Sequence, residues 1–222
     1  MGTPAAVPPS PNLFVRVVQV FVSPGVLFDS LKRRPVWVDA LVLLIVLAVA
    51  AQLLIPEETL RRLMEAQLPA GSDPEQLDRV IDFTRNWGVA LAAISTPISI
   101  AVVSGLLILA YNVILGGDAT FRQLFSATTH SFLVLTAGGL LTLGLVLAGG
   151  DQVVISPARL LPDLGSGYWA RFAYRINVFA IWNSIVLGIA VKRMYPKRSA
   201  GGATAYLLVL YAIVVAVSSL RA

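Results

Sequence analysis

Five long stretches of this chain contain no Asp, Glu, Lys or Arg, and this pattern constrains the fold more than any other feature. They are residues 40–55, 86–117, 123–150, 176–191 and 199–220. A helix needs about 20 mostly apolar residues to cross the hydrocarbon core of a bilayer, and the two shorter stretches reach this length with the residues just before them. We therefore expect membrane spans at about 36–55, 87–115, 126–149, 172–191 and 202–220.

The physics of the bilayer makes these spans helices. Backbone amides in lipid must be hydrogen-bonded within the protein, which leaves only helices and closed β-barrels. The alternating apolar and polar decamers of a membrane barrel are absent from the sequence. Only 13% of the residues are charged, about half the usual share in soluble domains. The predicted fold is an all-α polytopic membrane protein with five transmembrane helices.

Basic residues cluster next to the ends of the spans and predict the orientation of the chain. Short cytoplasmic loops are enriched in Lys and Arg. Arg122 lies between the second and third spans, and the other clusters precede the first span or join the fourth to the fifth: Lys32, Arg33, Arg34, Lys192, Arg193, Lys197 and Arg198. All three positions lie on one side of a five-span protein. We expect the N-terminus inside, the C-terminus outside, and these seven basic side chains against anionic lipid of the cytoplasmic leaflet.

The region before the first span divides into two parts. Residues 1–12 are rich in Pro and are expected to form a disordered tail. Residues 13–35 read as an interfacial amphipathic segment. Ser23 and Pro24 are a typical N-cap and first helical residue. Apolar residues then form one helix face before the basic cluster, and such a helix is expected to lie in the headgroup layer.

The composition excludes most kinds of catalytic site. The chain has no Cys and one His, so disulfides, thiolate nucleophiles and Cys- or His-rich metal centres are excluded. We predict no catalytic residue, no cofactor, no metal and no enzymatic activity. The basic residues sit at span ends rather than on a soluble domain, so we expect no nucleic-acid partner.

Polar residues inside the spans are the candidate functional side chains. They are His130, Asn112, Asn177, Asn183 and Ser184. An ionisable residue at membrane depth is a functional hypothesis by default, and the alternative for His130 is a neutral side chain bonded to Asn112 or Thr129. The Asn and Ser side chains are candidates for hydrogen bonds between helices. Pro97 is a candidate hinge because Pro removes a helix hydrogen bond.

Small and polar residues also recur at helical spacing and predict which faces turn inward. In the second span this face would carry Ala90, Ile94, Pro97, Ala101, Gly105, Ile108 and Asn112. In the third it would carry Ser126, His130, Leu133, Ala137, Leu140 and Gly144. Helices in lipid associate through small residues that permit close approach, so we expect these faces at the centre of the bundle.

Three sequence blocks together resemble the bacterial branch of the Yip (Ypt-interacting protein) domain family. They are residues 21–28 (FVSPGVLF) with Pro35 and Trp37, residues 111–124 (YNVILGGDATFRQL), and residues 177–184 (NVFAIWNS) followed by the basic loop. The resemblance implies a five-helix membrane protein with a cytoplasmic N-terminus. Eukaryotic relatives are associated with Rab-type GTPases and vesicle traffic, but their long N-terminal region and its D-L-Y-G-P motif are absent here. The resemblance carries over no catalytic residue.

Two functions from different classes follow from these features. The first is a non-catalytic membrane organiser or adaptor that binds other membrane proteins or lipid, in a prokaryotic plasma membrane. The second is a small-solute or ion transporter or channel, with the polar residues and Pro97 along a path through the bundle. The partners expected are anionic lipids, other membrane proteins and a second copy of the chain.

Overall fold

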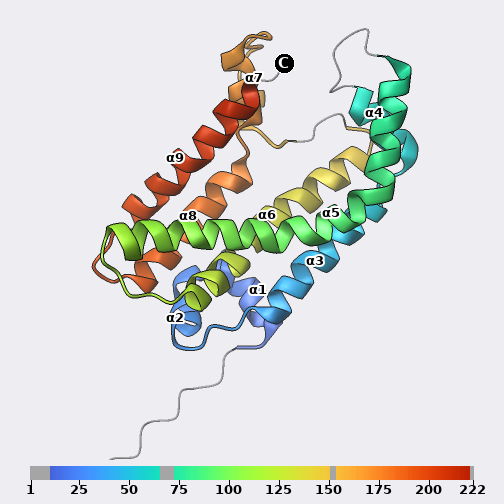
Figure 1. Cartoon of the computed structure of the whole chain (residues 1–222). Coiled ribbons are helices and arrows are strands. Elements are labelled where there is room, and N and C mark those ends of the chain that lie inside the picture. Colours follow the sequence, from blue (N-terminus) through green and yellow to red (C-terminus); the bar gives the residue numbers. More distant parts are fainter. Residues whose placement is uncertain (1–10, 66–72, 151–153, 221–222) are drawn as a thin grey trace, which may run out of the picture.

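The computed structural model describes residues 11–65, 73–150 and 154–220, and every regular element within these ranges is a helix (Figure 1). The predicted tail at 1–12 lies outside the described residues except for Pro11 and Asn12. The all-α prediction is confirmed.

The helices follow the predicted pattern of spans and short flanking segments. In chain order they are α1 (Leu13–Val22), α2 (Pro24–Arg33), α3 (Val38–Leu53), α4 (Glu57–Glu65), α5 (Pro74–Ile108), the π-helix η1 (Leu109–Ile114), α6 (Phe121–Leu147), the 3-10 helix η2 (Pro157–Leu160), α7 (Tyr168–Arg175), α8 (Val178–Met194) and α9 (Ala200–Ser219). The side chain of Asp73 caps α5 by accepting from the Glu75 N–H at 3.0 Å.

Three helices are long and apolar enough to cross a membrane without a break. They are α5 with η1, α6 and α9. The pair α3 and α4, bent by 87°, and the pair α7 and α8, bent by 58°, bring the number to five if each bent pair is one span. The chain is therefore a polytopic membrane protein with three to five spans.

The helix α6 lies at the centre of the bundle and contacts α1, α3, α5 and α8. Its first half is the most enclosed segment, since every residue from Ser126 to Ser131 is buried. Four of these six residues are Ser or Thr, and the other two are Ala127 and His130, so this part of the protein interior is polar. A core of Leu, Val, Ile and aromatic side chains surrounds it.

The predicted inward face of the second span is wrong. The buried residues of α5 and η1 include Ile100, Ser104, Leu107 and Tyr111, whereas Ile94 is 57% exposed. The predicted face of the third span is correct only for its first half, since Leu140 and Gly144 are exposed. The physical reason is that lipid accepts small and large apolar side chains equally, so their spacing does not say which face is inside.

The helices α1 and α2 pack against the bundle. The inner faces of both are buried: Val20, Leu27, Phe28 and Leu31 are fully enclosed. They contact α6 and α8. Ser23 occupies the predicted N-cap position of α2, with Pro24 as the first helical residue. A location in the headgroup layer remains a prediction for the outer face of this segment.

The three basic segments meet at one end of the bundle. Lys32 donates to the backbone oxygens of Arg193 and Met194 at 2.9 and 3.2 Å. Arg198 donates to the Leu115 oxygen at 2.7 Å, and Gln123 donates to the Lys32 oxygen at 2.8 Å. Figure 1 shows α2 at this end and α4 and α7 at the opposite end. Which end faces the cytoplasm remains a prediction.

Candidate functional site

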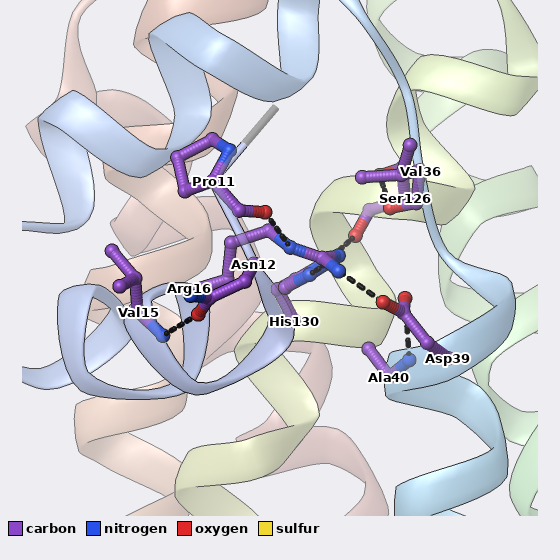
Figure 2. Close-up of polar contacts among 9 residues, drawn as sticks. All are labelled: Pro11, Asn12, Val15, Arg16, Val36, Asp39, Ala40, Ser126 and His130. Atoms are coloured by element: carbon purple, nitrogen blue, oxygen red, sulfur yellow. Dashed lines mark hydrogen bonds and ion pairs between the residues drawn. The ribbon is translucent and has the colours of Figure 1, made fainter. Parts of the chain in front are cut away.

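Arg16, Asp39 and His130 form a cluster where α1, α3 and α6 meet (Figure 2). The Arg16 guanidinium is paired with the Asp39 carboxylate, and its Nη1 lies 3.0 Å from His130 Nε2. Its Nε donates to the Pro11 oxygen at 3.0 Å. One buried guanidinium therefore joins three separate segments of the chain.

The partners of His130 determine its tautomer. Arginine is a donor only, so the ring nitrogen facing Arg16 must accept. The other ring nitrogen, Nδ1, lies 2.8 Å from the Ser126 backbone oxygen and must therefore donate. His130 is then a neutral imidazole with both nitrogens engaged. In this arrangement neither nitrogen is free to take a proton from a bound substrate.

Burial differs sharply across the cluster. The Arg16 side chain is 3% exposed, whereas the Asp39 side chain is 46% exposed. A buried charge is costly unless it is paired and hydrogen-bonded, and Arg16 meets both conditions. Asp39 lies in the first turn of α3 and also accepts from the Ala40 N–H at 2.9 Å. The cluster thus fixes α1 against α3 and α6.

A second contact holds the entry to α3 on α6. The Ser126 hydroxyl donates to the Val36 oxygen at 2.7 Å (Figure 2). The Trp37 ring meets the Phe125 ring edge-on, with 5.1 Å between centroids. The Phe21 ring of α1 likewise meets Trp182 of α8 at 5.5 Å. The aromatic residues of two blocks that carried the family resemblance, Phe21 and Trp182, therefore pack against each other.

The sequence interpretation of His130 was partly wrong. Its partners are Arg16 and the Ser126 oxygen rather than Asn112 or Thr129. No functional role was predicted for Arg16, which lies within residues 13–35, the segment expected to be interfacial. The available signal was its position: it lies four residues before Val20 on a helix whose other residues, except Gln19, are apolar.

Asn112 belongs to a separate cluster at the same end of the bundle. Its side chain donates to the Ala119 oxygen at 2.7 Å and accepts from the Tyr195 hydroxyl at 2.6 Å. The rings of Tyr111 and Tyr195 stack with 5.2 Å between centroids. Gly117 lies directly beneath, where a Cβ would meet the Tyr195 ring. This cluster joins the loop before α6 to the loop after α8.

The Tyr195 phenol is held in its neutral form. Burial, followed by the charge of nearby Asp118, raises the pKa of Tyr195 to about 12. Only 5% of the residue is exposed. The hydroxyl therefore remains a donor to Asn112 across the physiological range of pH.

The other predicted polar residues have distinct places. Asn177 caps α8 by accepting from the Phe179 N–H at 2.8 Å, and its own N–H donates to the Tyr211 hydroxyl at 2.7 Å. The Ser184 hydroxyl donates to the Ala180 oxygen within α8 at 2.9 Å. The candidate sites therefore do not form one continuous group.

Asn183 and Pro97 differ from these satisfied residues. The side-chain oxygen of Asn183 is buried without a hydrogen-bond partner. Pro97 lies inside α5, which continues unbroken to Ile108, and Thr96 donates to the Ala92 oxygen beside it at 3.0 Å. Figure 1 shows α5 turning between its teal first part and its green second part. A hinge at Pro97 remains a prediction.

The predicted lipid-facing basic residues fall into two groups. Arg193 pairs with Asp29 at 3.2 Å and Lys192 donates to the Pro196 oxygen at 2.8 Å, so these two, like Lys32 and Arg198, serve contacts within the chain. Arg33, Arg34 and Lys197 are exposed, and their side chains make no such contact with the described residues. Within the described residues, no group of three or more His, Cys, Asp or Glu side chains could hold a metal ion.

Comparison with models of known protein families shows which family this chain belongs to. The Yip1 domain model matches residues 18–220, which include every transmembrane helix. The chain belongs to the Yip1 domain family. The resemblance drawn from the three sequence blocks is confirmed.

A bacterial membrane protein is also similar to this chain. The chain is 27% identical to membrane protein YknW of Bacillus subtilis over 188 residues, covering 82% of this chain and 78% of the relative. No solved structure matches the chain. Together with the apolar helices, these findings place this Yip1-domain protein in a membrane as a multi-pass protein, in line with the predicted bacterial location.

Proposed function

We propose that this Yip1-family protein is a non-catalytic membrane organiser or adaptor. It binds anionic lipid and other membrane proteins through the end of the bundle where α1, α2 and the basic segments meet. The single observation that supports this proposal most is that α1 has two apolar faces, only one of which is covered by the bundle.

The uncovered face of α1 runs along the whole helix. Phe14, Val18 and Val22 are 75, 42 and 73% exposed, and they follow one another at four-residue spacing. Val26 at the start of α2 is also 58% exposed. We define these four residues as the outer apolar row. The buried Arg16 cluster fixes α1 on the bundle, so the row is presented in one orientation.

Charge at this end favours an anionic membrane surface as one ligand. Arg33 is the last residue of α2, Arg34 follows it, and both are exposed. Each Lys or Arg near an anionic leaflet contributes about 1 kcal/mol of attraction. An apolar row beside exposed bases is typical of helices that lie in the membrane interface, where neighbouring proteins can also dock.

The alternative of a solute path receives no support from the geometry. A transporter of this kind would need polar groups that line one continuous route. His130 is closed off by Arg16, Asn112 is bonded to Tyr195, and Asn177 serves as a helix cap. Each of these three groups is used in local structure at a separate place.

The test is capture of partners and lipids with a variant that alters only the outer apolar row. We would replace Phe14 and Val22 by Ser, cross-link native membranes, and purify the tagged protein in mild detergent. The matched control is Leu160→Ser, because Leu160 is 90% exposed at the other end of the bundle. Retained lipid is identified by native mass spectrometry, with Arg33→Gln and Arg34→Gln as the charge variants.

We expect a specific membrane-protein partner or anionic lipid with the parent chain and the control, and its loss with the outer-row variant. Equal recovery from all variants, or no specific partner and no preference for anionic lipid, would overturn the proposal.

A further inference from the structure

A groove runs between α5, α6, α8 and α9 at the depth of the membrane. Its volume is about 400 Å³, within the range of protein binding pockets. Its walls are aliphatic and aromatic with few exceptions, and include Leu106 and Leu107 of α5, Phe132 and Leu135 of α6, and Leu187 of α8. An apolar groove of this kind would ordinarily hold lipid chains.

Asn183 makes this groove unusual. The residue lines the groove, and its side-chain oxygen is buried without a hydrogen-bond partner. A buried polar group without a partner carries a free-energy cost that natural proteins rarely leave uncompensated. Ser184 also lines the groove, but its hydroxyl is already bonded to the Ala180 oxygen. Asn183 is half-buried, and no hydrogen bond joins its side-chain amide to the described residues, so it calls for a hydrogen-bond partner from outside the chain.

The depth of Asn183 restricts where that hydrogen-bond partner can come from. Lys192 marks the basic end of α8, nine positions further along the helix. At 1.5 Å per residue this places Asn183 about 13 Å from the level of the headgroups. The hydrocarbon core is about 30 Å thick, so Asn183 lies near its middle. Lipid headgroups do not reach this depth, whereas a polar side chain of another transmembrane helix does.

The groove is open to the lipid on one side. Val102 of α5 and Val214 of α9 both line it and are 56 and 65% exposed. The two residues belong to different helices of the groove wall. A partner helix that packed against the groove could contact both helices and place one row of side chains in the groove.

We propose that this groove binds a transmembrane helix of a partner protein, and that a Ser, Thr, Asn or Gln near the middle of that helix hydrogen-bonds to the side-chain amide of Asn183. Helices in lipid associate through packing and through such hydrogen bonds. The inference rests on the proposed adaptor function and names the class of partner and the place where it binds.

The test uses photo-cross-linking from chosen positions of the full chain in native membranes. A photo-reactive amino acid replaces Val214, which lines the groove, or Ile213, which is 55% exposed on the same helix but does not line it. The cross-linked peptide is identified by mass spectrometry. Asn183→Leu removes the oxygen and keeps a similar volume, and Ser184→Ala is its matched control.

We expect position 214, and not 213, to capture a transmembrane segment of another protein that carries a polar residue near its centre. Asn183→Leu lowers the yield about three- to tenfold, the effect of one interhelical hydrogen bond, while Ser184→Ala leaves it unchanged. The thermal midpoint of the Asn183→Leu chain shows whether the loss reflects unfolding, and we expect the midpoint to stay equal or to rise.

Several results would overturn the inference. They are adducts with lipid only, adducts with a second copy of this chain, equal capture from positions 213 and 214, or a yield that Asn183→Leu does not lower. If a partner is captured through the outer apolar row but not at position 214, the adaptor function stands and the groove inference fails. If neither position nor row captures a partner or anionic lipid, both fail.

Discussion

Arg16 Nη1 and His130 Nε2 lie 3.0 Å apart although 114 positions separate the residues in the chain. The contact joins the short helix α1 to the central helix α6. Because Arg16 is also paired with Asp39, a single side chain fixes the relative positions of α1, α3 and α6. The outer apolar row on α1 owes its orientation to this cluster.

Replacing His130 by Leu is expected to destabilise the protein and loosen α1. The variant leaves one Arg16 donor buried without an acceptor, at a cost of about 1–3 kcal/mol. The Gln variant can still present an oxygen to Arg16, so its loss of stability is expected to be smaller. Thermal unfolding in detergent gives the order, and hydrogen exchange reports whether α1 opens first.

The control for this prediction is Arg33→Gln, since Arg33 is exposed and outside the cluster. It is expected to change stability by less than about 0.5 kcal/mol. A His130→Leu protein as stable as the parent, with α1 protected from exchange to the same degree, would show that the Arg16–His130 contact contributes nothing.

The spans were predictable because lipid imposes a simple rule on composition. A stretch without charges that is about 20 residues long has few alternatives to a membrane helix. Lys32, Arg122 and Lys192 were also expected at one end of the bundle. Two predicted spans separate each of these residues from the next, so all three lie on the same side of the membrane. The family followed from the short blocks around Trp37, Asn112 and Trp182.

The contacts inside the bundle were not predictable from the sequence. Arg16 lies in an apolar segment too short to span the membrane, and nothing in the sequence pairs it with Asp39 or His130. The inward face of α5 was also missed, because Ile94 and Ile100 are equally apolar and only the packing distinguishes them. The unpartnered state of Asn183 depends on where α5 and α9 lie, which one sequence does not give.

The stability of the protein is expected to fall as the pH rises from about 10 to about 12, in part because of Tyr195. The ordinary pKa of Tyr is about 10, and burial raises that of Tyr195 to about 12 in the folded protein. The unfolded chain therefore loses this proton first, and the contribution is complete below pH 10 and lost as the pH approaches 12. Other groups also titrate there, so the measured quantity is the difference between the parent and Tyr195→Phe.

The same variant loses the hydrogen bond to Asn112 at neutral pH, and we expect it to be about 0.5–1.5 kcal/mol less stable there. Its pH profile should be flatter between 10 and 12. Parallel profiles for the two proteins would contradict the assigned environment of Tyr195.

Two glycines provide a matched test of helix packing. A Cβ on Gly188 of α8 would lie 3.0 Å from the Ala200 backbone oxygen and collide with the Thr204 side chain of α9, whereas a Cβ on Gly105 of α5 would meet nothing within 4 Å. We expect Gly188→Ala to cost about 1–3 kcal/mol by overpacking. Gly105→Ala should be neutral or stabilising by up to about 1 kcal/mol, since Ala favours helix. Unfolding of both variants in one detergent checks this, and the opposite order would show that α8 and α9 do not approach as described.

The orientation in the membrane can be tested directly because the chain has no cysteine. Lys197 is exposed at the basic end and Leu160 is 90% exposed at the other, so a single cysteine at either position leaves the core untouched. If short basic loops remain inside the cell, an impermeant thiol reagent added to intact cells labels Leu160→Cys and not Lys197→Cys, and both are labelled after the membrane is opened.

The reverse pattern would mean that the basic end faces outward, and that the anionic cytoplasmic leaflet is not the ligand of Arg33 and Arg34. Labelling of both positions in intact cells would mean that the two ends do not lie on opposite sides of the membrane, which would contradict the arrangement of the spans.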